Sequence, residues 1–399
     1  MKRLLKFCFT IGCCAVLFWI ASSNYQFCNN ANGYIINSDN KNITVPQFDW
    51  SEDGLGISTD VTVDTTLLSS VDFSDCYAHS LLNEKEQQAY ELIYEVLMSH
   101  TPTIHLNADV ADRIDVIYQS VCADHGEIFW TDGYDYTYYK QSGEIIDIVF
   151  SPSYTYSVTE RDKYQSIIEE RLAVFLSGVT SDMTDYEKSK YIYDVLITNV
   201  SYNKKAEHNQ NIVSVFVNGE TVCRGYASAV QYMCSILGVE SVIVDGLVGE
   251  EPHTWNLVKL DGKWYHLDVT WGNSKYKAGN NTVPYTDYNY LNVTQDSILQ
   301  THSIRKLFKL PVCDSTDNSY FVKENCIFYN YDETGIGELV SKCKKGDTLY
   351  LKFGDAAVYE MVINKLFIDK ILFDYCKNGI KGYSYIEDTI HNTIVIVFN

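Results

Sequence analysis

The sequence has few basic residues for its length. Its 399 residues include 31 lysines and arginines against 52 aspartates and glutamates, which gives a net charge of −21 at pH 7. A surface with this excess of negative charge repels the phosphate backbone of DNA or RNA. Nucleic acid is therefore not expected as a partner. Long runs of like charge are also missing, so the charge is interpreted as an ordinary soluble surface.

Several motifs of other protein classes are missing as well. No two cysteines have the CxxC spacing of a structural zinc site, and nothing resembles a glycine-rich phosphate loop. Internal repeats and low-complexity tracts are not visible either. We therefore expect no metal and no cofactor.

The first 23 residues have the plan of an export signal. Lys2, Arg3 and Lys6 precede an uncharged apolar run from Phe7 to Ala21, and a small residue, Ser23, offers a cleavage point. The run is short for a membrane span, which needs roughly 20 residues, although a retained anchor is an open alternative. We expect residues 1–23 to be a signal peptide or an N-terminal membrane anchor. The protein would then be secreted or held at the cell surface.

The twelve cysteines do not have the distribution of a disulfide framework. Three lie in the export segment, and the remaining nine are spread thinly over a long chain. An odd count leaves at least one thiol without an intramolecular partner. The nine are Cys28, Cys76, Cys122, Cys223, Cys234, Cys313, Cys326, Cys343 and Cys376.

Helical and strand patterns alternate along the chain and predict an α+β fold. After the export segment we expect a linker rich in Asn, Ser, Asp and Thr, an N-terminal α+β region, a central domain and a small C-terminal α+β domain. The expected boundaries are 1–23, 24–75, 76–158, 159–304 and 305–399. Expected helices include 160–177, 185–199 and 356–367, and expected strands lie within 320–331, 347–353 and 382–399.

The N-terminal region begins with a helix signature. Asn83 stands three positions before Glu86, the spacing of a capping box. A second helix follows, and then a strand-rich stretch with turn signals at Asp132-Gly133 and Ser142-Gly143. Tyrosines and phenylalanines alternate there, and we interpret them as sheet packing, with a glycan-binding face as the alternative.

Residues 221–237, TVCRGYASAVQYMCSIL, place two cysteines in one helix. A core-facing stripe at helical spacing joins Cys223, Tyr226, Ala227, Val230, Cys234 and Leu237, and Gly238 is a natural C-cap. Cys234 lies three turns into the helix and is interpreted as packing. Cys223 begins the helix, where unpaired N–H groups and the helix dipole favour a thiolate and can stabilise an oxyanion.

The segment HTWNLVKLDGKWYHLDVTW, which begins at His253, predicts a hairpin that carries a base and an acid. Asp261-Gly262 is a strong two-residue turn signal, and it pairs Leu260 with Lys263. Extended along both strands, this register makes His253 and Asp268 diagonal neighbours on one face, within reach of a hydrogen bond. A slip of one residue would separate them. The carboxylate would then orient the imidazole, as in a catalytic triad.

His266 is a rival for the role of base. Alternation places it on the same face as Asp268, opposite Leu257, but His253 lies at the open start of the strand, where active sites gather. We therefore prefer His253 and interpret His266 as a structural histidine. The remaining histidines have no carboxylate partner placed by local sequence and are interpreted as structural or solvated: His79, His100, His105, His125, His208, His302 and His391.

These residues resemble the core of the transglutaminase-like superfamily, including its bacterial exported members. The matching strings are GETVCRGYASAVQYMCSILGV, HTWNLVKLDGKWYHLDVTWGN and the upstream NVSYN, which contains Tyr202. The resemblance covers about residues 185–272 and implies a papain-like fold, with a cysteine-bearing helix packed on an antiparallel sheet. It also implies that Cys223 is the nucleophile, His253 the base and Asp268 the orienting acid.

Two further expectations follow from the resemblance. Tyr202 or Tyr226 would supply an oxyanion donor. Nothing corresponds to the calcium-binding acidic loops or flanking β-sandwiches of animal transglutaminases, so calcium dependence is not expected.

The sequence therefore predicts an exported cysteine-dependent acyl-transfer enzyme. It would act on amide bonds of proteins or peptides, including cell-wall peptides, through a thioester. Hydrolysis would make it a peptidase or amidase, and transfer to an amine would make it a protein-glutamine cross-linking enzyme. The alternative is a non-catalytic cell-surface binding module that retains the fold and binds through the aromatic strands at 129–156 or the C-terminal domain.

Overall fold

The computed structural model of the chain contains two compact units. It describes residues 5–7, 73–278, 281–377 and 379–399. Of the described residues, the first unit contains 5–7, 73–270 and 301–313, and the second contains 271–278, 281–300, 314–377 and 379–399. This division differs from the expected boundary after residue 304, and the domain boundaries remain predictions. Among the residues that the structure describes, none of the helices is both long and apolar enough to span a bilayer.

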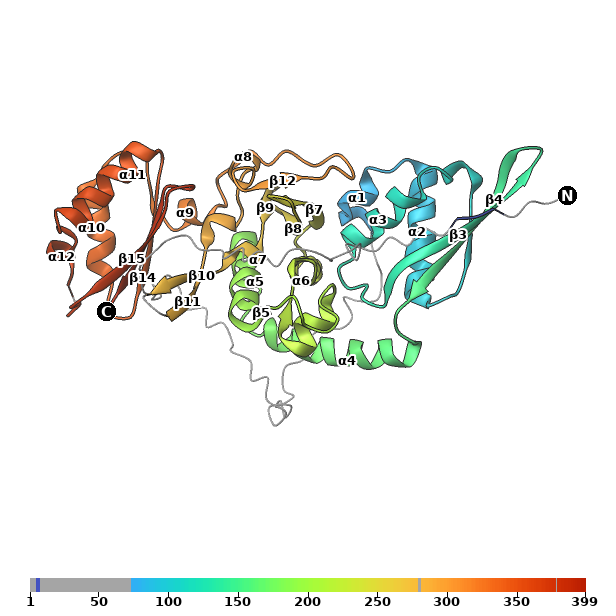
Figure 1. The fold of residues 1–399 in the computed structure, drawn as a ribbon, viewed down its shortest axis with the longest axis horizontal. Helices are drawn as coiled ribbons and strands as arrows, with labels where there is room; N and C mark the ends of the chain where they lie inside the picture. Colours follow the sequence, from blue (N-terminus) through green and yellow to red (C-terminus); the bar gives the residue numbers. More distant parts are fainter. Residues whose placement is uncertain (1–4, 8–72, 279–280, 378) are drawn as a thin grey trace. The chain divides into compact units, whose positions relative to one another are not determined.

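Most of the first unit follows the elements expected from the sequence (Figure 1). The expected export segment and linker lie outside the described residues, apart from Leu5–Phe7 and Phe73–Asp75. The strands are β1 (Leu5–Phe7), β2 (Ile104–Leu106), β3 (Thr131–Gln141), β4 (Glu144–Tyr154), β5 (Ser201–Tyr202), β6 (Glu220–Thr221), β7 (Ser241–Val248), β8 (Glu251–Leu260), β9 (Lys263–Leu267) and β12 (His302–Ile304). The helices are η3 (Phe73–Asp75), α1 (Tyr77–Ser80), α2 (Glu84–Ser99), η4 (Ala108–Val110), α3 (Ile114–Asp124), α4 (Val158–Phe175), α5 (Asp185–Asn199), η5 (Ser214–Asn218) and α6 (Cys223–Ile236).

Helices α2 and α3 share a core with a sheet of strand order β1-β3-β4-β2. The Asn83 side chain accepts hydrogen bonds from the N–H groups of Lys85 and Glu86, so the predicted capping box is confirmed. The Ser142-Gly143 turn is also confirmed, since both residues have positive φ, 54° and 92°. The expected turn at Asp132-Gly133 is wrong. These residues lie inside β3, where Gly133 follows a register shift against β4.

Helix α6 lies at the centre of the first unit. Ten consecutive residues, 225–234, are buried, so the members of the predicted stripe in this stretch face the core and the other sides of the helix are covered as well. Strands β7 and β8 pack on it. The C-terminal end of α3 packs against another side of α6. There the Gln231 carboxamide accepts a hydrogen bond from the Gly126 N–H at 2.7 Å and donates one to the Asp124 carbonyl. A polar side chain in the middle of α6 thus ties the N-terminal region to it.

We expect Gly126→Ala to destabilise the protein by about 1–3 kcal/mol, the usual range for an overpacked site. A Cβ at Gly126 would lie 2.3 Å from the Ser228 carbonyl oxygen, which belongs to the backbone of α6 and cannot rotate away. Gly382→Ala is the control, because its Cβ would meet only the Asn399 Cβ, at 3.6 Å. Denaturant unfolding measures both variants, and equal losses would contradict the proposed close approach.

The β8–β9 hairpin has the predicted register. Asp261 and Gly262 form the turn with positive φ of 50° and 77°. Five pairs follow from Leu260↔Lys263 to Asn256↔Leu267, in agreement with the prediction. The next three expected rungs, from Trp255–Asp268 to His253–Thr270, do not form, because β9 ends at Leu267 and the short helix α7 (Val269–Gly272) begins immediately after Asp268. The hairpin belongs to a sheet of order β12-β7-β8-β9.

The second unit is an α+β fold of its own, in which Figure 1 shows α10, α11 and α12 on one side of the main sheet. That sheet has the order β13-β14-β16-β15. The strands are β10 (Asn273–Ala278), β11 (Asn281–Thr286), β13 (Ile327–Phe328), β14 (Thr348–Phe353), β15 (Tyr383–Asp388) and β16 (Thr393–Phe398). The helices are η6 (Tyr288–Tyr290), α8 (Gln295–Ile298), α9 (Tyr320–Lys323), α10 (Glu333–Lys342), α11 (Ala356–Ile363), η7 (Asn364–Ile368) and α12 (Leu372–Tyr375).

Two parts of this unit differ from the sequence expectation. Tyr320–Lys323, expected as a strand, is helix α9, and only Ile327–Phe328 of that stretch is extended. Helix α10 was not predicted. Its signals were present, because Asp332 caps it through the Gly335 N–H and the buried Ile336 and Val340 have helical spacing.

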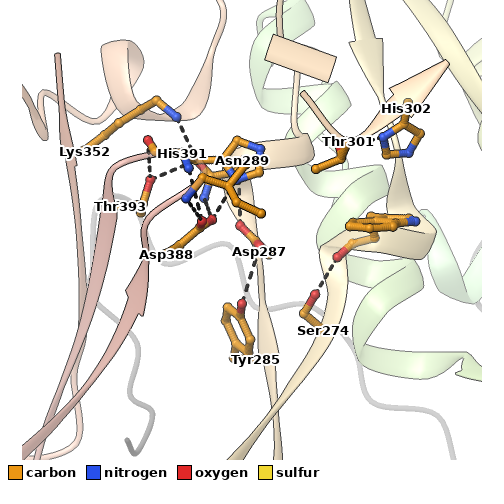
Figure 2. A network of polar contacts seen from close by, with 12 residues as sticks. Ser274, Tyr285, Asp287, Asn289, Thr301, His302, Lys352, Asp388, His391 and Thr393 are labelled. Carbon is orange, nitrogen blue, oxygen red and sulfur yellow. Dashed lines mark hydrogen bonds and ion pairs between the residues drawn. The ribbon is translucent and has the colours of Figure 1, made fainter. Parts of the chain in front are cut away.

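A buried polar network ties together the sheet of the second unit and η6 (Figure 2). The Asn289 side chain donates to Asp388 at 3.2 Å and accepts from Lys352 at 2.8 Å and Thr393 at 3.0 Å. His391 contacts Asp388 at 2.7 Å. Burial lowers the pKa of Lys352 to about 8, against the charge of Asp388. Asn289, Lys352, Thr393 and the Nδ1 atom of His391 each have a hydrogen-bonding partner, which is typical of a structural network.

Candidate active site

Cys223 is the first residue of α6, as predicted. The preceding residue, Val222, is the N-cap, and its side chain makes no capping hydrogen bond because it has no polar atom. The N–H groups of the first turn therefore remain oriented toward whatever occupies this end of the helix. Cys223 is half-buried. This position suits a nucleophile whose attack generates an oxyanion.

Cys234 has the opposite environment. It is fully buried in the middle of α6, and burial raises the pKa of its thiol to about 12. A thiol in this state is a packing group, as the sequence predicted. All eight cysteines in the described part of the chain are free thiols.

His253 and Asp268 meet as predicted, although the ladder stops at Leu267 and Asp268 lies just beyond the end of β9. His253 Nε2 lies 2.6 Å from Asp268 Oδ2, and both side chains are buried. Since Nε2 is taken by the carboxylate, Nδ1 is the ring nitrogen left for Cys223, which is close enough to contribute to the raised pKa of His253. The hairpin is fixed to α6 by Asn256, whose Nδ2 donates to the Ala227 carbonyl at 2.9 Å. The sheet and the helix thus bring the three predicted residues together.

The electrostatics of the pair favour the charged forms. Burial alone would lower the pKa of His253, but the Asp268 charge and the hydrogen bonds to Asp268 and Cys223 raise it to about 10. Burial alone would raise the pKa of Asp268, but His253 and His302 hold it well below its usual value. The geometry therefore supports an imidazolium next to a carboxylate, with a thiol on the other side of the ring.

His266 is the rival base from the sequence, and its contacts are structural. It is fully buried, and its Nδ1 accepts a hydrogen bond from Trp255 Nε1 at 2.9 Å. Burial and the electrostatic interaction with His302 lower its pKa to about 3, so the ring is neutral. The Trp255 ring, held in this way, stacks on the His253 ring at 5.8 Å between centroids and 18° between planes. His266 thus supports the platform on which the His253 imidazole lies.

His302 is the residue that sequence reasoning missed. It had no assigned carboxylate partner, but its Nε2 lies 3.0 Å from Asp268 Oδ2. The expectation that local sequence places no carboxylate beside the other histidines is wrong for His125–Glu127 and His391–Asp388, which are two and three positions apart. His79–Glu91 and His105–Asp147 also pair, over 12 and 42 positions, which local sequence does not reveal.

The ligand atoms of His253, Asp268 and His302 lie within 4.8 Å of one another, so these residues could together hold a metal ion. The two contacts to Asp268 have hydrogen-bond lengths, 2.6 and 3.0 Å. Ligands of an ion such as Zn²⁺, with bonds of about 2.0–2.2 Å in a tetrahedron, would have to move apart. The observed distances fit hydrogen bonds between the histidines and the carboxylate better than metal coordination.

The two oxyanion candidates have different surroundings. Tyr226 is buried, and its hydroxyl donates to the Val200 carbonyl, so this tyrosine is committed to the backbone. Tyr202 is 37% exposed, and burial together with the negative charges of Cys223, Glu251 and Asp268 raises its pKa to about 12. Its hydroxyl is thus a protonated donor near Cys223. Strand β5 places it there, because Tyr202 pairs with Thr221, two residues before Cys223.

A second cysteine and histidine meet in the first unit. Cys76 Sγ lies 3.9 Å from His125 Nε2, and Nδ1 of that ring contacts Glu127 at 3.0 Å. The residue types match those of the candidate site, but burial raises the pKa of the Cys76 thiol. Cys76 also precedes a helix of only four residues. It therefore serves as an internal control for the reactivity of Cys223.

A cysteine at a helix start, opposite a histidine and a carboxylate on an antiparallel sheet, is the arrangement of papain-like thiol proteins. Residues 175–269 match the family model of the transglutaminase-like superfamily. The chain therefore contains a core domain of this superfamily. The match covers α5, α6 and the β7–β9 sheet, which are the elements that carry the candidate site.

The curated relatives include the kyphoscoliosis peptidases of mouse and human. Both are 28% identical to this chain, over 119 residues for Mus musculus and 134 residues for Homo sapiens. These segments make up 24% and 26% of this chain and 18% and 20% of the relatives, so the matched part spans about a fifth of their length. A solved structure described as a TGase is 12% identical and covers 38% of this chain and 47% of its own, with a TM-score of 0.27.

Proposed function

We propose that this protein is a cysteine-dependent acyl-transfer enzyme that cleaves amide bonds through a thioester on Cys223. The observation that carries the proposal is the 2.6 Å contact between His253 and Asp268 beside a cysteine at the start of a 14-residue helix. The membership of its core in the transglutaminase-like superfamily supports the same chemistry.

Each group has a defined part in the proposed reaction. The Cys223 thiolate attacks the amide carbonyl, and the oxyanion accepts hydrogen bonds from N–H groups at the start of α6 and from the Tyr202 hydroxyl. His253 gives its proton to the departing amine, the C–N bond breaks and a thioester remains. Water or an amine then attacks the thioester while His253 takes up a proton, and the thiolate is restored. Asp268 keeps the imidazole oriented and stabilises its charged form.

The second step decides the product, and we favour hydrolysis. An enzyme that transfers the acyl group to an amine must exclude water from the cleft. Tyr202 is more than one third exposed next to Cys223, so water has access to this side of the proposed site. The proposed substrates are proteins or peptides, and cell-wall peptides would be accessible if residues 1–23 direct export.

The proposal is tested with a glutamine-containing peptide, offered with and without a primary amine. Ammonia release, amine incorporation and backbone cleavage are followed together by mass spectrometry. We expect cleavage or ammonia release without the amine, and incorporation that stays a minor product when it is present. Products that wild type and Cys223→Ala form equally would sink the proposal, and so would a wild type that forms none. A protein that binds peptides in both forms without turnover would instead be the non-catalytic binding module.

His253 gives the stability of the protein a pH dependence of defined sign. Its pKa is raised from 6.5 to about 10 in the folded protein. The stabilisation is therefore complete below the unfolded value of about 6.5 and is lost as the pH rises through about 10. We expect the difference in Tm between wild type and His253→Gln to be largest near pH 6 and to shrink toward pH 10. Circular dichroism melts measure it, and a difference that grows with pH would show a neutral imidazole in the folded protein.

A further inference from the structure

Two histidines hold Asp268, and only one of them has a part in the proposed chemistry. His302 Nε2 contacts the carboxylate at 3.0 Å, on the same oxygen, Oδ2, that His253 contacts at 2.6 Å. The side chains of Asp268 and His302 are 1% and 0% exposed, so water does not screen this contact. His302 is therefore a buried second partner of the acid in the site.

The other ring nitrogen of His302 also has a polar neighbour. The Thr301 hydroxyl lies 2.7 Å from Nδ1 of the His302 ring. When this hydroxyl donates to Nδ1, the ring proton stands on Nε2, which then donates to Asp268. His302 also begins β12 and pairs with Val248 of β7, so the sheet holds the ring independently of the hairpin turn that places His253 and Asp268.

We propose that His302 is a positioning residue of the catalytic centre, which orients the Asp268 carboxylate and limits how strongly it attracts a protonated His253. This inference rests on the proposed function of the site. A hydrogen bond donated to Oδ2 shares the negative charge of the carboxylate. Without it the imidazolium of His253 is held more tightly and gives its proton less readily to the departing amine.

The other titratable groups that face this centre come from three elements. They are Cys223 on α6, Tyr202 on β5 and His266 on β9. A substitution at residue 302 leaves these three side chains in place. Of the three, His266 is the one whose pKa His302 lowers, and at about 3 that pKa lies far below the range in which His253 titrates. A change in the titration of His253 therefore reports the loss of the His302 contact.

The test compares His302→Leu, which removes the donor, with His302→Gln, which keeps an N–H donor near the position of Nε2. NMR titration of the His253 ring and the pH profile of kcat/KM are the readouts. We expect His302→Leu to lower kcat by about 10- to 100-fold with a smaller change in KM, the loss typical of a hydrogen bond to a charged group. The His253 titration and the alkaline limb should both move to higher pH. His302→Gln should restore both toward wild type.

Two further variants test whether the effect is specific to the contact between His302 and Asp268. Thr301→Val removes the donor to Nδ1, and it should shift the His253 titration in the same direction by less. His391→Leu breaks the other buried histidine–aspartate contact, that with Asp388, and should leave the titration unchanged. The inference is overturned if His302→Leu titrates like wild type, or if His302→Gln is as impaired as His302→Leu. The NMR readout needs no turnover, so a failure of the proposed function would be seen separately, in Cys223→Ala.

Discussion

Cys223→Ala is expected to lower kcat/KM by about 10⁴-fold or more, because no other group in the site can form the thioester. The side chain is half-buried, so its removal should change Tm little. Cys223→Ser tests the same point with nearly the same volume, since a hydroxyl beside a protonated imidazole has no base to activate it. Turnover of the peptide substrate, measured beside Tm, separates lost chemistry from lost folding.

Cys234→Ala is the matched control, in the same helix. It removes a fully buried thiol and leaves a cavity, so it should destabilise the protein by about 1–3 kcal/mol while activity at low temperature is retained. Alkylation by iodoacetamide gives a comparison without substrate: Cys223 should react faster than Cys76, whose pKa is raised by burial beside its own histidine. Equal rates at the two cysteines, or a Cys223→Ala variant that retains a tenth of the activity, would exclude Cys223 as the nucleophile.

Local sequence could predict the part of the site whose position depends on a single turn. Asp261-Gly262 determines the register of the hairpin up to Asn256↔Leu267, and Asp268, the next residue, reaches His253 across only fifteen positions. His302 could not be found in this way. It reaches Asp268 because β12 adds to the far side of β7, and residues 271–300, which belong to the second unit, separate the two in sequence. No local pattern encodes that return of the chain.

Helix α6 shows a second limit of sequence reasoning. Its spacing predicts one apolar face, but Gln231 and Ser228 are buried too, because the end of α3 covers a side that the stripe left polar. A buried glutamine is stable there since both ends of its carboxamide bind backbone groups, those of Gly126 and Asp124. Only tertiary structure shows these partners. The position of Cys223 was predictable nonetheless, since a helix start depends on neighbouring residues.

Asp268→Asn should lower kcat by about 10²- to 10⁴-fold, because the amide keeps the size of the side chain but not its charge. Both histidines contact Oδ2, and an amide oxygen at that position could keep the geometry while no longer favouring an imidazolium. The pKa of His253 should therefore fall from its raised value, and the alkaline limb of the pH profile should move to lower pH. This shift is opposite in sign to that expected for His302→Leu.

Asp388→Asn is the control for this variant, because Asp388 makes the corresponding buried contact to His391 in the second unit. It should lower stability without changing the pH profile. An Asp268→Asn enzyme that is slow but keeps the wild-type alkaline limb would mean that Asp268 only orients the ring. If the alkaline limb moves to lower pH in Asp268→Asn and to higher pH in His302→Leu, the charge of the Asp268 carboxylate sets the pKa of His253, and the His302 contact weakens that effect.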